Sequence, residues 1–367
     1  MPKTERLSRR GNSGFLKIIN EYPPEFSEEN RWICFLKLVI QMNYYYNDPT
    51  GFYRRREEKR SEIKRLGLLV GGAFLLYVLL QYVISFTLSL AGLLDKYMAD
   101  SVFQSGVDTV IIIISLLTPF YFMNGRIKKI SRIEEPLCLE KPHKATEFLV
   151  AVLAGVGVCM FANIVTSYFT LIMEAFSVHL EAPEIAMPTG VWGVAITTVR
   201  VVVCAAMTEE IAMRGYVMGN LRAYGDKFAI VISSVMFAAM HGNLVQAPFA
   251  LIAGFAIGYF SIKTGSVWTG IAIHALNNGI SVGISYAAEY LSEEAANFIS
   301  VILIYGLIAV GALALMLFLL MTKEKRLSDS CTELSLKEKC GAFILNPTML
   351  ITFAYMVYIT SLHIGIG

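Results

Sequence analysis

The chain has 367 residues, of which 55% are hydrophobic and only 16% are charged, and its formal net charge is +2. A soluble domain carries about a quarter charged residues, so this composition excludes an ordinary soluble protein, and the small net charge gives no reason to expect a nucleic-acid partner. Several apolar runs reach the roughly 20 residues that cross a bilayer. The composition therefore predicts an all-α, polytopic integral membrane bundle whose first partner is the lipid bilayer.

The first part of the chain, residues 1–65, is basic and contains "RRREEKR", so we predict a cytosolic N-terminal segment. Its apolar run at 32–42 is too short to span a membrane and predicts an interfacial helix or a small packed element. A transmembrane domain follows over residues 66–321. It holds eight apolar runs, each of which predicts a spanning helix: 66–94, 103–124, 147–174, 191–222, 227–241, 246–262, 266–289 and 296–321. Residues 322–367 are predicted to form a cytosolic loop and an apolar C-terminal segment, with 348–367 as a possible ninth span.

The charges of the loops predict the orientation of these spans. The loops at 125–145 and 322–340 are rich in Lys and Arg, as is the segment before the first span. The loops near 175–190 and 289–295 contain no Lys or Arg. Because basic loops remain on the cytosolic side, the N-terminus is predicted to be cytosolic, and the membrane to be the cell membrane if the protein is bacterial.

Charged residues interrupt the fourth apolar run, in "TEEIAMRGY" at 208–216. Each charge at the centre of a bilayer helix costs roughly 3 kcal/mol on insertion scales. Glu210 and Arg214 are four residues apart, so they share one helix face and can form an ion pair that offsets this cost. Glu209 is turned by about 100° along the helix and is free for another partner.

Polar residues also occur in two later apolar runs, as His241 in "FAAMH" and as His274 and Asn278 in "HALNN". Glu209 precedes the turn at Gly225 by as many residues as His241 follows it, so both are predicted to lie roughly 24 Å along antiparallel helices. His274 and Asn278 are four residues apart and can face one point. A carboxylate near a histidine can hold and deprotonate water, and a second histidine with an asparagine can donate hydrogen bonds to an oxyanion. These residue types together predict a hydrolytic site.

The three sequences fit the motifs EExxxR, FxxxH and HxxxN, in this order and in separate apolar runs. The chain thereby resembles the CAAX-protease and bacteriocin-processing family, whose type member is a prenyl-protein endopeptidase. The matching region covers roughly residues 190–285, the predicted catalytic core. The resemblance implies an intramembrane endopeptidase that hydrolyses a peptide bond in a membrane-associated protein or peptide, in CAAX-type C-terminal processing or in peptide and bacteriocin processing.

The resemblance also implies a role for each motif residue. Glu209, with His241, would activate water; His274 and Asn278 would form the oxyanion hole; Glu210 and Arg214 would orient the site. No cofactor is implied, although a Glu/His/His set could hold zinc, which is the alternative. The sequence has no HExxH motif.

Two other functions compete with the endopeptidase. A protein with intact motifs could act as a membrane scaffold or a bacteriocin self-immunity protein in which catalysis is dispensable. A proton-coupled transporter also buries Glu, Arg and His, but it is expected to show inverted repeats or paired broken helices. We find neither pattern in the sequence.

Overall fold

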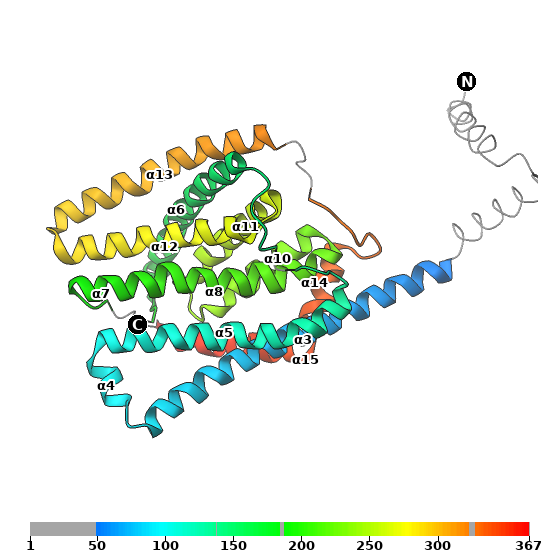
Figure 1. Ribbon diagram of the computed structural model, residues 1–367, viewed down its shortest axis with the longest axis horizontal. Coiled ribbons are helices and arrows are strands. Elements are labelled where there is room, and N and C mark those ends of the chain that lie inside the picture. Colours follow the sequence, from blue (N-terminus) through cyan, green and yellow to red (C-terminus); the bar gives the residue numbers. More distant parts are fainter. Residues whose placement is uncertain (1–48, 137, 184–186, 323–326, 367) are drawn as a thin grey trace, which may run out of the picture. The chain divides into compact units, whose positions relative to one another are not determined.

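The structure is a computed structural model that describes residues 49–136, 138–183, 187–322 and 327–366 (Figure 1). The chain divides into two compact units, Met1–Arg56 and Glu57–Gly367. The apolar run at 32–42 and most of the predicted N-terminal segment lie outside the described residues. Helix α3 (Pro49–Leu90) crosses the predicted boundary after residue 65 without a break, so the basic residues before that point continue directly into the first apolar run.

The second unit is built almost entirely of helices. Besides α3 they are α4 (Leu94–Ala99), α5 (Ser101–Ser131), α6 (Ala145–Ala175), α10 (Asp226–Met240), α11 (Ala247–Thr264), α12 (Val267–Tyr290), α13 (Glu293–Met321), α14 (Leu336–Ile344) and α15 (Pro347–Ser361), together with the irregular helix Gly190–Tyr224. Two short strands, β1 (Val178–Leu180) and β2 (Ile364–Ile366), pair with each other. Each of the eight apolar runs predicted between residues 66 and 321 falls on a helix, which confirms the polytopic helical bundle. The chain is an integral membrane protein.

Within the described residues, six helices are long and apolar enough to cross a membrane: Gly51–Leu90, Ser101–Ser131, Ala145–Ala175, Gly190–Tyr224, Ala247–Thr264 and Glu293–Met321. The number is seven if α14 and α15, which meet at a bend of 81°, form one span. Helix α10 has only 15 residues, and α12 carries the polar "HALNN" sequence, which lowers its mean hydropathy. The count of eight spans stays a prediction.

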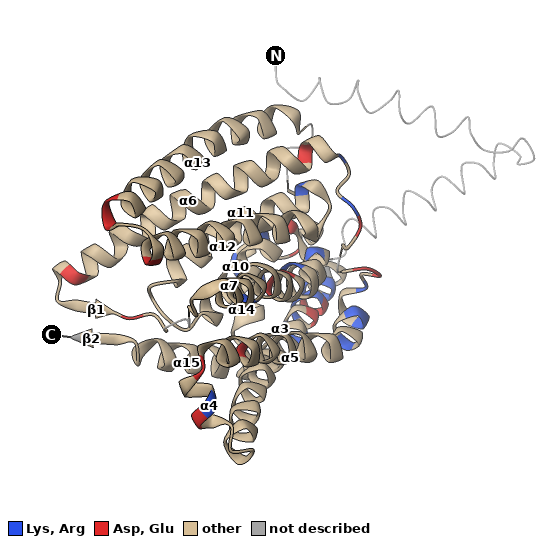
Figure 2. Ribbon diagram, turned by 60° about the vertical axis from the view of Figure 1, so that its left-hand side comes forward, with Lys and Arg blue, Asp and Glu red and all other residues tan. Residues whose placement is uncertain are grey.

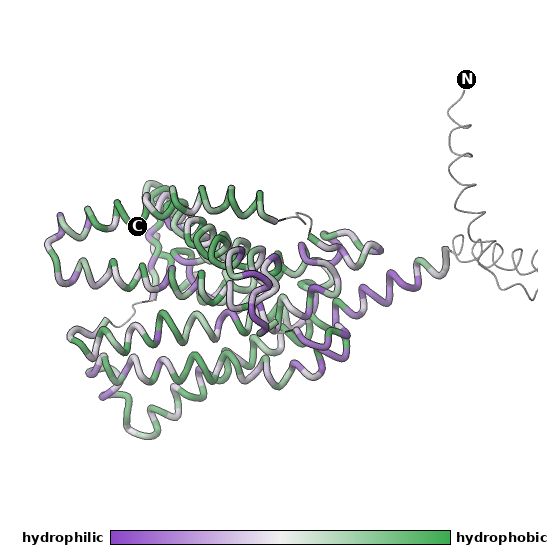
Figure 3. Tube along the Cα trace, turned by 45° about the horizontal axis from the view of Figure 1, so that its top comes forward, coloured by the Kyte–Doolittle hydropathy of each residue, from purple (hydrophilic) through white to green (hydrophobic). Residues whose placement is uncertain are grey.

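The outer faces of the long helices carry exposed apolar side chains, as expected for surfaces that meet lipid tails. On α13, Leu313 and Leu320 are 65% and 73% exposed, and on α6 Leu149 and Tyr168 are 59% and 63% exposed. Figure 3 shows the hydrophobic residues spread along the bundle and the hydrophilic ones gathered toward one end. A soluble protein rarely exposes so much contiguous apolar surface, so this distribution fits a membrane environment.

The basic loops meet at one end of the bundle. The backbone N–H of Val267 donates to the carbonyl of Cys138, and that of Asp226 donates to the carbonyl of Ser328. The first bond joins the start of α12 to the loop before α6, and the second joins the start of α10 to the segment after α13. Figure 2 shows most Lys and Arg residues gathered at one end of the bundle. At the other end β1 pairs with β2, and Gly190 N–H donates to the Tyr290 hydroxyl. Which end faces the cytosol stays a prediction.

The helix Gly190–Tyr224 is not a regular α-helix. It consists of α7 (Gly190–Thr197), π-helix η1 (Thr198–Ala205), α8 (Ala206–Glu210), π-helix η2 (Ile211–Met218), α9 (Gly219–Leu221) and 3₁₀-helix η3 (Arg222–Tyr224). π-helical turns are rare and occur frequently at functional sites. Both motif glutamates lie on α8, between the two π-helical stretches, so the helix widens on either side of them.

Helices α10 and α11 form a hairpin that packs against this irregular helix. The chain leaves η3 through Gly225, whose φ of +120° is a conformation that L side chains rarely adopt, and α10 then runs back along η2. The α10–α11 turn is held by Asn243, whose amide donates to Gln246 Oε1 and whose Oδ1 accepts from the Gln246 backbone N–H. His241 therefore stands at the C-terminal end of α10, at a turn, and not in the middle of a long span.

Candidate active site

A cavity of about 570 Å³ lies between α5, α6, η1, α8, α10, α11 and α12. Four of the six predicted site residues line it: Glu209, His241, His274 and Asn278. Glu210 and Arg214 do not line it, and their side chains are fully buried. The structure thus brings residues of all three motifs to one cavity, while the Glu210–Arg214 pair is buried outside it.

The Glu210–Arg214 ion pair predicted from the four-residue spacing is present. Arg214 Nη1 donates to Glu210 Oε1 at 3.0 Å, and Nη2 donates to the Gly254 carbonyl at 3.2 Å. The guanidinium carbon also lies 4.6 Å from the centre of the Phe237 ring. An opposite charge, a carbonyl and an aromatic face each compensate part of the cost of burying this cation.

Glu210 also holds His274. The Glu210 Oε1 atom lies 3.0 Å from His274 Nδ1, and because an ionised carboxylate only accepts, Nδ1 carries the hydrogen. The ring is thereby turned so that its Nε2 lies 3.9 Å from Glu209 Oε2. This contact between α8 and α12 is the physical means by which Glu210 and Arg214 can orient the site.

Glu209 lines the cavity and has an unused acceptor. The residue is 8% exposed, and its Oε2 atom is buried and has no hydrogen-bond partner among the described residues. A buried polar atom without a partner costs free energy, so such an atom beside a cavity is a place where water or a ligand binds.

The imidazole ring of His241 is oriented by a hydrogen bond to its own helix. Its Nδ1 lies 2.8 Å from the Phe237 carbonyl, which can only accept, so Nδ1 is the donor and Nε2 of the neutral ring carries a lone pair. The Phe237 ring packs edge-on against both His241 and His274, at centroid distances of 5.0 and 5.7 Å. One aromatic ring thus separates and positions the two histidines.

Asn278 is anchored to the irregular helix. Its Nδ2 donates to the Val201 carbonyl at 2.9 Å, which uses one of the two amide hydrogens. Any hydrogen bond to an oxyanion would therefore come from the second hydrogen.

Asn277, Asp108 and Arg200 are among the further polar residues that line the cavity and that the sequence interpretation did not select. Arg200 Nη1 donates to Asp108 Oδ2 at 2.9 Å, and Asp108 Oδ1 accepts from the Tyr97 hydroxyl at 2.8 Å. The sequence did contain a signal for this pair, because Asp108 and Arg200 are charged residues inside the apolar runs 103–124 and 191–222. An intramembrane charge usually has a partner and a function.

The donor set does not fit a zinc ion in the described part of the chain, where no three His, Cys, Asp or Glu side chains are grouped so as to hold a metal. Glu209, His241 and His274 share the cavity, but their donor atoms do not form such a group. We therefore derive no step through zinc.

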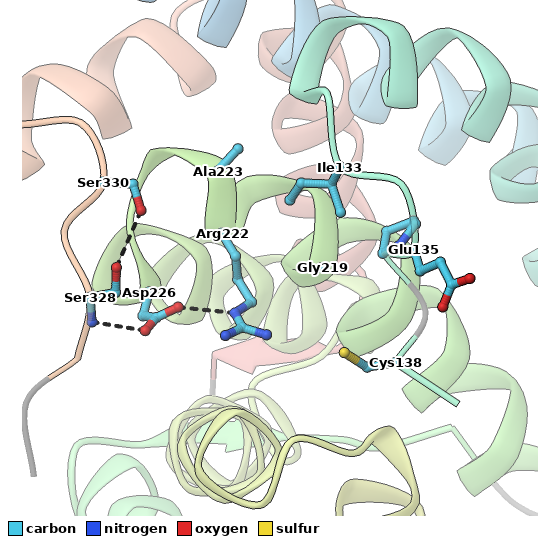
Figure 4. Close-up of a pocket in the computed structure, with 10 residues that line it drawn as sticks. Ile133, Glu135, Cys138, Gly219, Arg222, Ala223, Asp226, Ser328 and Ser330 are labelled. Carbon is cyan, nitrogen blue, oxygen red and sulfur yellow. Dashed lines mark hydrogen bonds and ion pairs between the residues drawn. The ribbon is translucent and has the colours of Figure 1, made fainter. Parts of the chain in front are cut away.

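A second, smaller cavity of about 250 Å³ lies at the end where the basic loops meet (Figure 4). Arg222 Nε donates to Asp226 Oδ1 at 3.0 Å, and Asp226 Oδ2 accepts from the Ser328 backbone N–H at 2.8 Å. These bonds tie the start of α10 to Arg222 and to the segment after α13, and no histidine lines this cavity. Its contacts are structural, so the larger cavity is the candidate active site.

Comparison with known proteins gives one family. Residues 190–280 match the family described as Type II CAAX prenyl endopeptidase Rce1-like, a family of proteases. The matched segment contains all three motifs and runs from the start of α7 into α12. The searches of curated proteins and of solved structures give no significant match. The family resemblance predicted from EExxxR, FxxxH and HxxxN is thus confirmed, and residues 190–280 are an Rce1-like segment.

Proposed function

We propose that this protein is an intramembrane endopeptidase that hydrolyses a peptide bond in a membrane-associated protein or peptide, with CAAX-type C-terminal processing or peptide processing as its reaction. One observation carries the proposal. Glu209 has a buried oxygen without a partner among the described residues, in the same cavity as the available Nε2 of His241. The Rce1-like match supports the same conclusion.

In the proposed first step, a water molecule donates its hydrogens to Glu209 Oε2 and His241 Nε2. Glu209 removes one proton as the water oxygen attacks the substrate carbonyl carbon, so that an O–H bond breaks and a C–O bond forms. The substrate carbonyl oxygen becomes an oxyanion. The second amide hydrogen of Asn278 and, in its protonated form, the Nε2 hydrogen of His274 stabilise that charge.

In the second step the tetrahedral intermediate collapses. The C–N bond breaks, and the proton held by Glu209 passes to the departing amine nitrogen, which leaves a carboxylic acid and an amine. Glu210 and Arg214 do not touch the reacting atoms. They fix His274 through the hydrogen bond to its Nδ1 and so act as positioning residues.

The test is cleavage of membrane-associated peptides by the purified protein, followed by mass spectrometry. The substrate panel includes peptides with and without a prenylated cysteine near the C-terminus. We expect wild-type protein to cleave at one bond and Glu209→Gln to lose at least 10²-fold in rate, the lower range for loss of a general base. Glu289→Gln is the matched control, because Glu289 is exposed on α12 and does not line the cavity.

The rival functions give other results in the same assay. A scaffold or self-immunity protein would bind peptides or partners without cleaving them, and wild-type and Glu209→Gln protein would behave alike. Equal cleavage by wild-type and Glu209→Gln protein would show that another group activates the water.

A further inference from the structure

Asn277 lies in the candidate active site and has no role in the steps above. The residue is 4% exposed, lines the cavity and directly precedes Asn278 on α12. Its Oδ1 atom is buried and has no hydrogen-bond partner among the described residues. Asn277, like Glu209, thus has an unused acceptor on a side chain that lines the cavity.

Neighbouring hydrogen bonds fix the direction of this amide. Asn277 Nδ2 donates to Asn278 Oδ1 at 3.3 Å, and Asn278 Nδ2 donates in turn to the Val201 carbonyl at 2.9 Å. Because the nitrogen of Asn277 is engaged on this side, its oxygen points away from Asn278. A relay of two amides anchored on η1 therefore holds the Asn277 oxygen in place.

The chemistry of that oxygen selects its ligand. A carboxamide oxygen only accepts hydrogen bonds, so the group that satisfies it must be a donor. An extended peptide in a cavity at bilayer depth presents a backbone N–H at each residue, and each needs an acceptor because lipid offers none. An unused acceptor beside Asn278 fits such an N–H close to the scissile bond.

We propose that Asn277 Oδ1 accepts a hydrogen bond from a backbone N–H of the substrate, one or two residues from the scissile bond, and that Asn277 is a substrate-binding residue. This inference rests on the proposed endopeptidase function. It adds that the peptide main chain, and not only a lipid group or a side chain, is recognised in the cavity.

The experiment combines Asn277 variants with substrates that lack one N–H at a time. In each substrate analogue a single non-scissile amide near the cleaved bond is replaced by an ester, which removes the hydrogen with little change of shape. We expect Asn277→Ala to lower kcat/KM about 3- to 10-fold with the all-amide substrate, the range of one lost hydrogen bond. With the ester substrate that lacks the hydrogen bonded to Asn277, Asn277→Ala should lower kcat/KM no further.

Two additional variants separate binding from folding. Asn277→Leu removes the same polar atoms and keeps a similar volume. It replaces Asn277→Ala in the kinetic comparison if Asn277→Ala does not fold. Asn124→Ala is the matched control, since Asn124 Oδ1 on α5 is also buried without a partner in the described structure, yet Asn124 lines neither cavity. Asn124→Ala should change kcat/KM only slightly, and by the same factor for the amide and the ester substrates.

The outcomes distinguish the two proposals. If wild-type protein cleaves no peptide, the endopeptidase function fails. If wild-type protein cleaves and the losses from Asn277→Ala and from every ester multiply, or Asn277→Ala has no effect, the function stands and the assignment of Asn277 is overturned.

Discussion

Glu210 is the residue on which the geometry of the site depends. A single carboxylate oxygen, Oε1, accepts from both Arg214 and His274. The guanidinium compensates the buried charge, and the imidazole is held so that its second nitrogen faces Glu209. A substitution of Arg214 should therefore lower both the thermal stability and the turnover, although Arg214 lies outside the cavity.

Arg214→Ala should leave the Glu210 carboxylate buried without its cation. Removing one partner of a buried ion pair costs roughly 3–5 kcal/mol, so we expect a lower thermal unfolding temperature, poor expression and reduced turnover. Glu289→Gln, on an exposed side chain, provides the reference. Normal thermal stability of Arg214→Ala would show that Arg214 does not neutralise Glu210.

Metal content distinguishes the two mechanisms implied by the sequence resemblance. We expect purified, active protein to contain far less than one zinc per chain and to keep its rate in the presence of a chelator. Elemental analysis alongside the peptide assay measures both. Close to one zinc per chain, lost in His241→Ala, together with reversible inhibition by the chelator, would establish the zinc alternative.

At the scale of elements, the short helix α8 and helix α12 meet at a point where only glycine fits. A Cβ added at Gly270 would lie 2.9 Å from Glu210 Oε2 and 2.8 Å from Ser261 Oγ, closer than such atoms approach. Glu210 is held by two hydrogen bonds and has little freedom to move aside. The absence of a side chain at Gly270 therefore allows α12 to bring His274 against Glu210.

Gly270→Ala should displace Glu210 or move α12, and so lower turnover at least tenfold while the protein remains folded in the membrane. The estimate follows from the sensitivity of catalysis to small displacements, where 1 Å costs about 10²-fold. Gly283→Ala is the control on the same helix, because a Cβ there meets nothing within 4 Å. Equal activity of the two variants would contradict the described contact between α8 and α12.

Periodicity and spacing predicted the helices and the contacts within one helix. The Glu210–Arg214 pair follows from a four-residue interval, and that interval needs no tertiary information. The Glu210–His274 contact could not be predicted, since spacing within α12 does not fix how α12 is rotated against α8. The π-helical stretches around α8 also had no sequence signal, because the apolar pattern reads as one continuous span.

At the scale of the whole second unit, the C-terminal segment runs from one end of the bundle to the other. Thr348 and Thr352 donate to the carbonyls of Leu68 and Gly71, so α15 follows α3 in the same direction. Strand β2 then pairs with β1, beyond the end of α6. The sequence left open whether 348–367 crosses the membrane, and these contacts favour a crossing.

Cysteine labelling in intact cells measures this arrangement. In a parent chain whose cysteines are changed to serine, the exposed residues Lys337 and Leu362 are changed to cysteine one at a time. We expect an impermeant thiol reagent to label Leu362→Cys from the same side as Glu181→Cys, and Lys337→Cys from the opposite side. Labelling of Lys337→Cys and Leu362→Cys from one side would mean that α15 does not cross.

Glu209 and His241 are proposed to act on the same water molecule, and a double-mutant cycle measures whether they do. The measurement is kcat/KM for peptide cleavage by wild-type protein, Glu209→Gln, His241→Ala and the double variant. Residues that act as one unit show strongly non-additive losses. We predict that the double variant is about as slow as the slower single variant. Losses that multiply would show that the two residues act independently and would contradict the proposed water-activating pair.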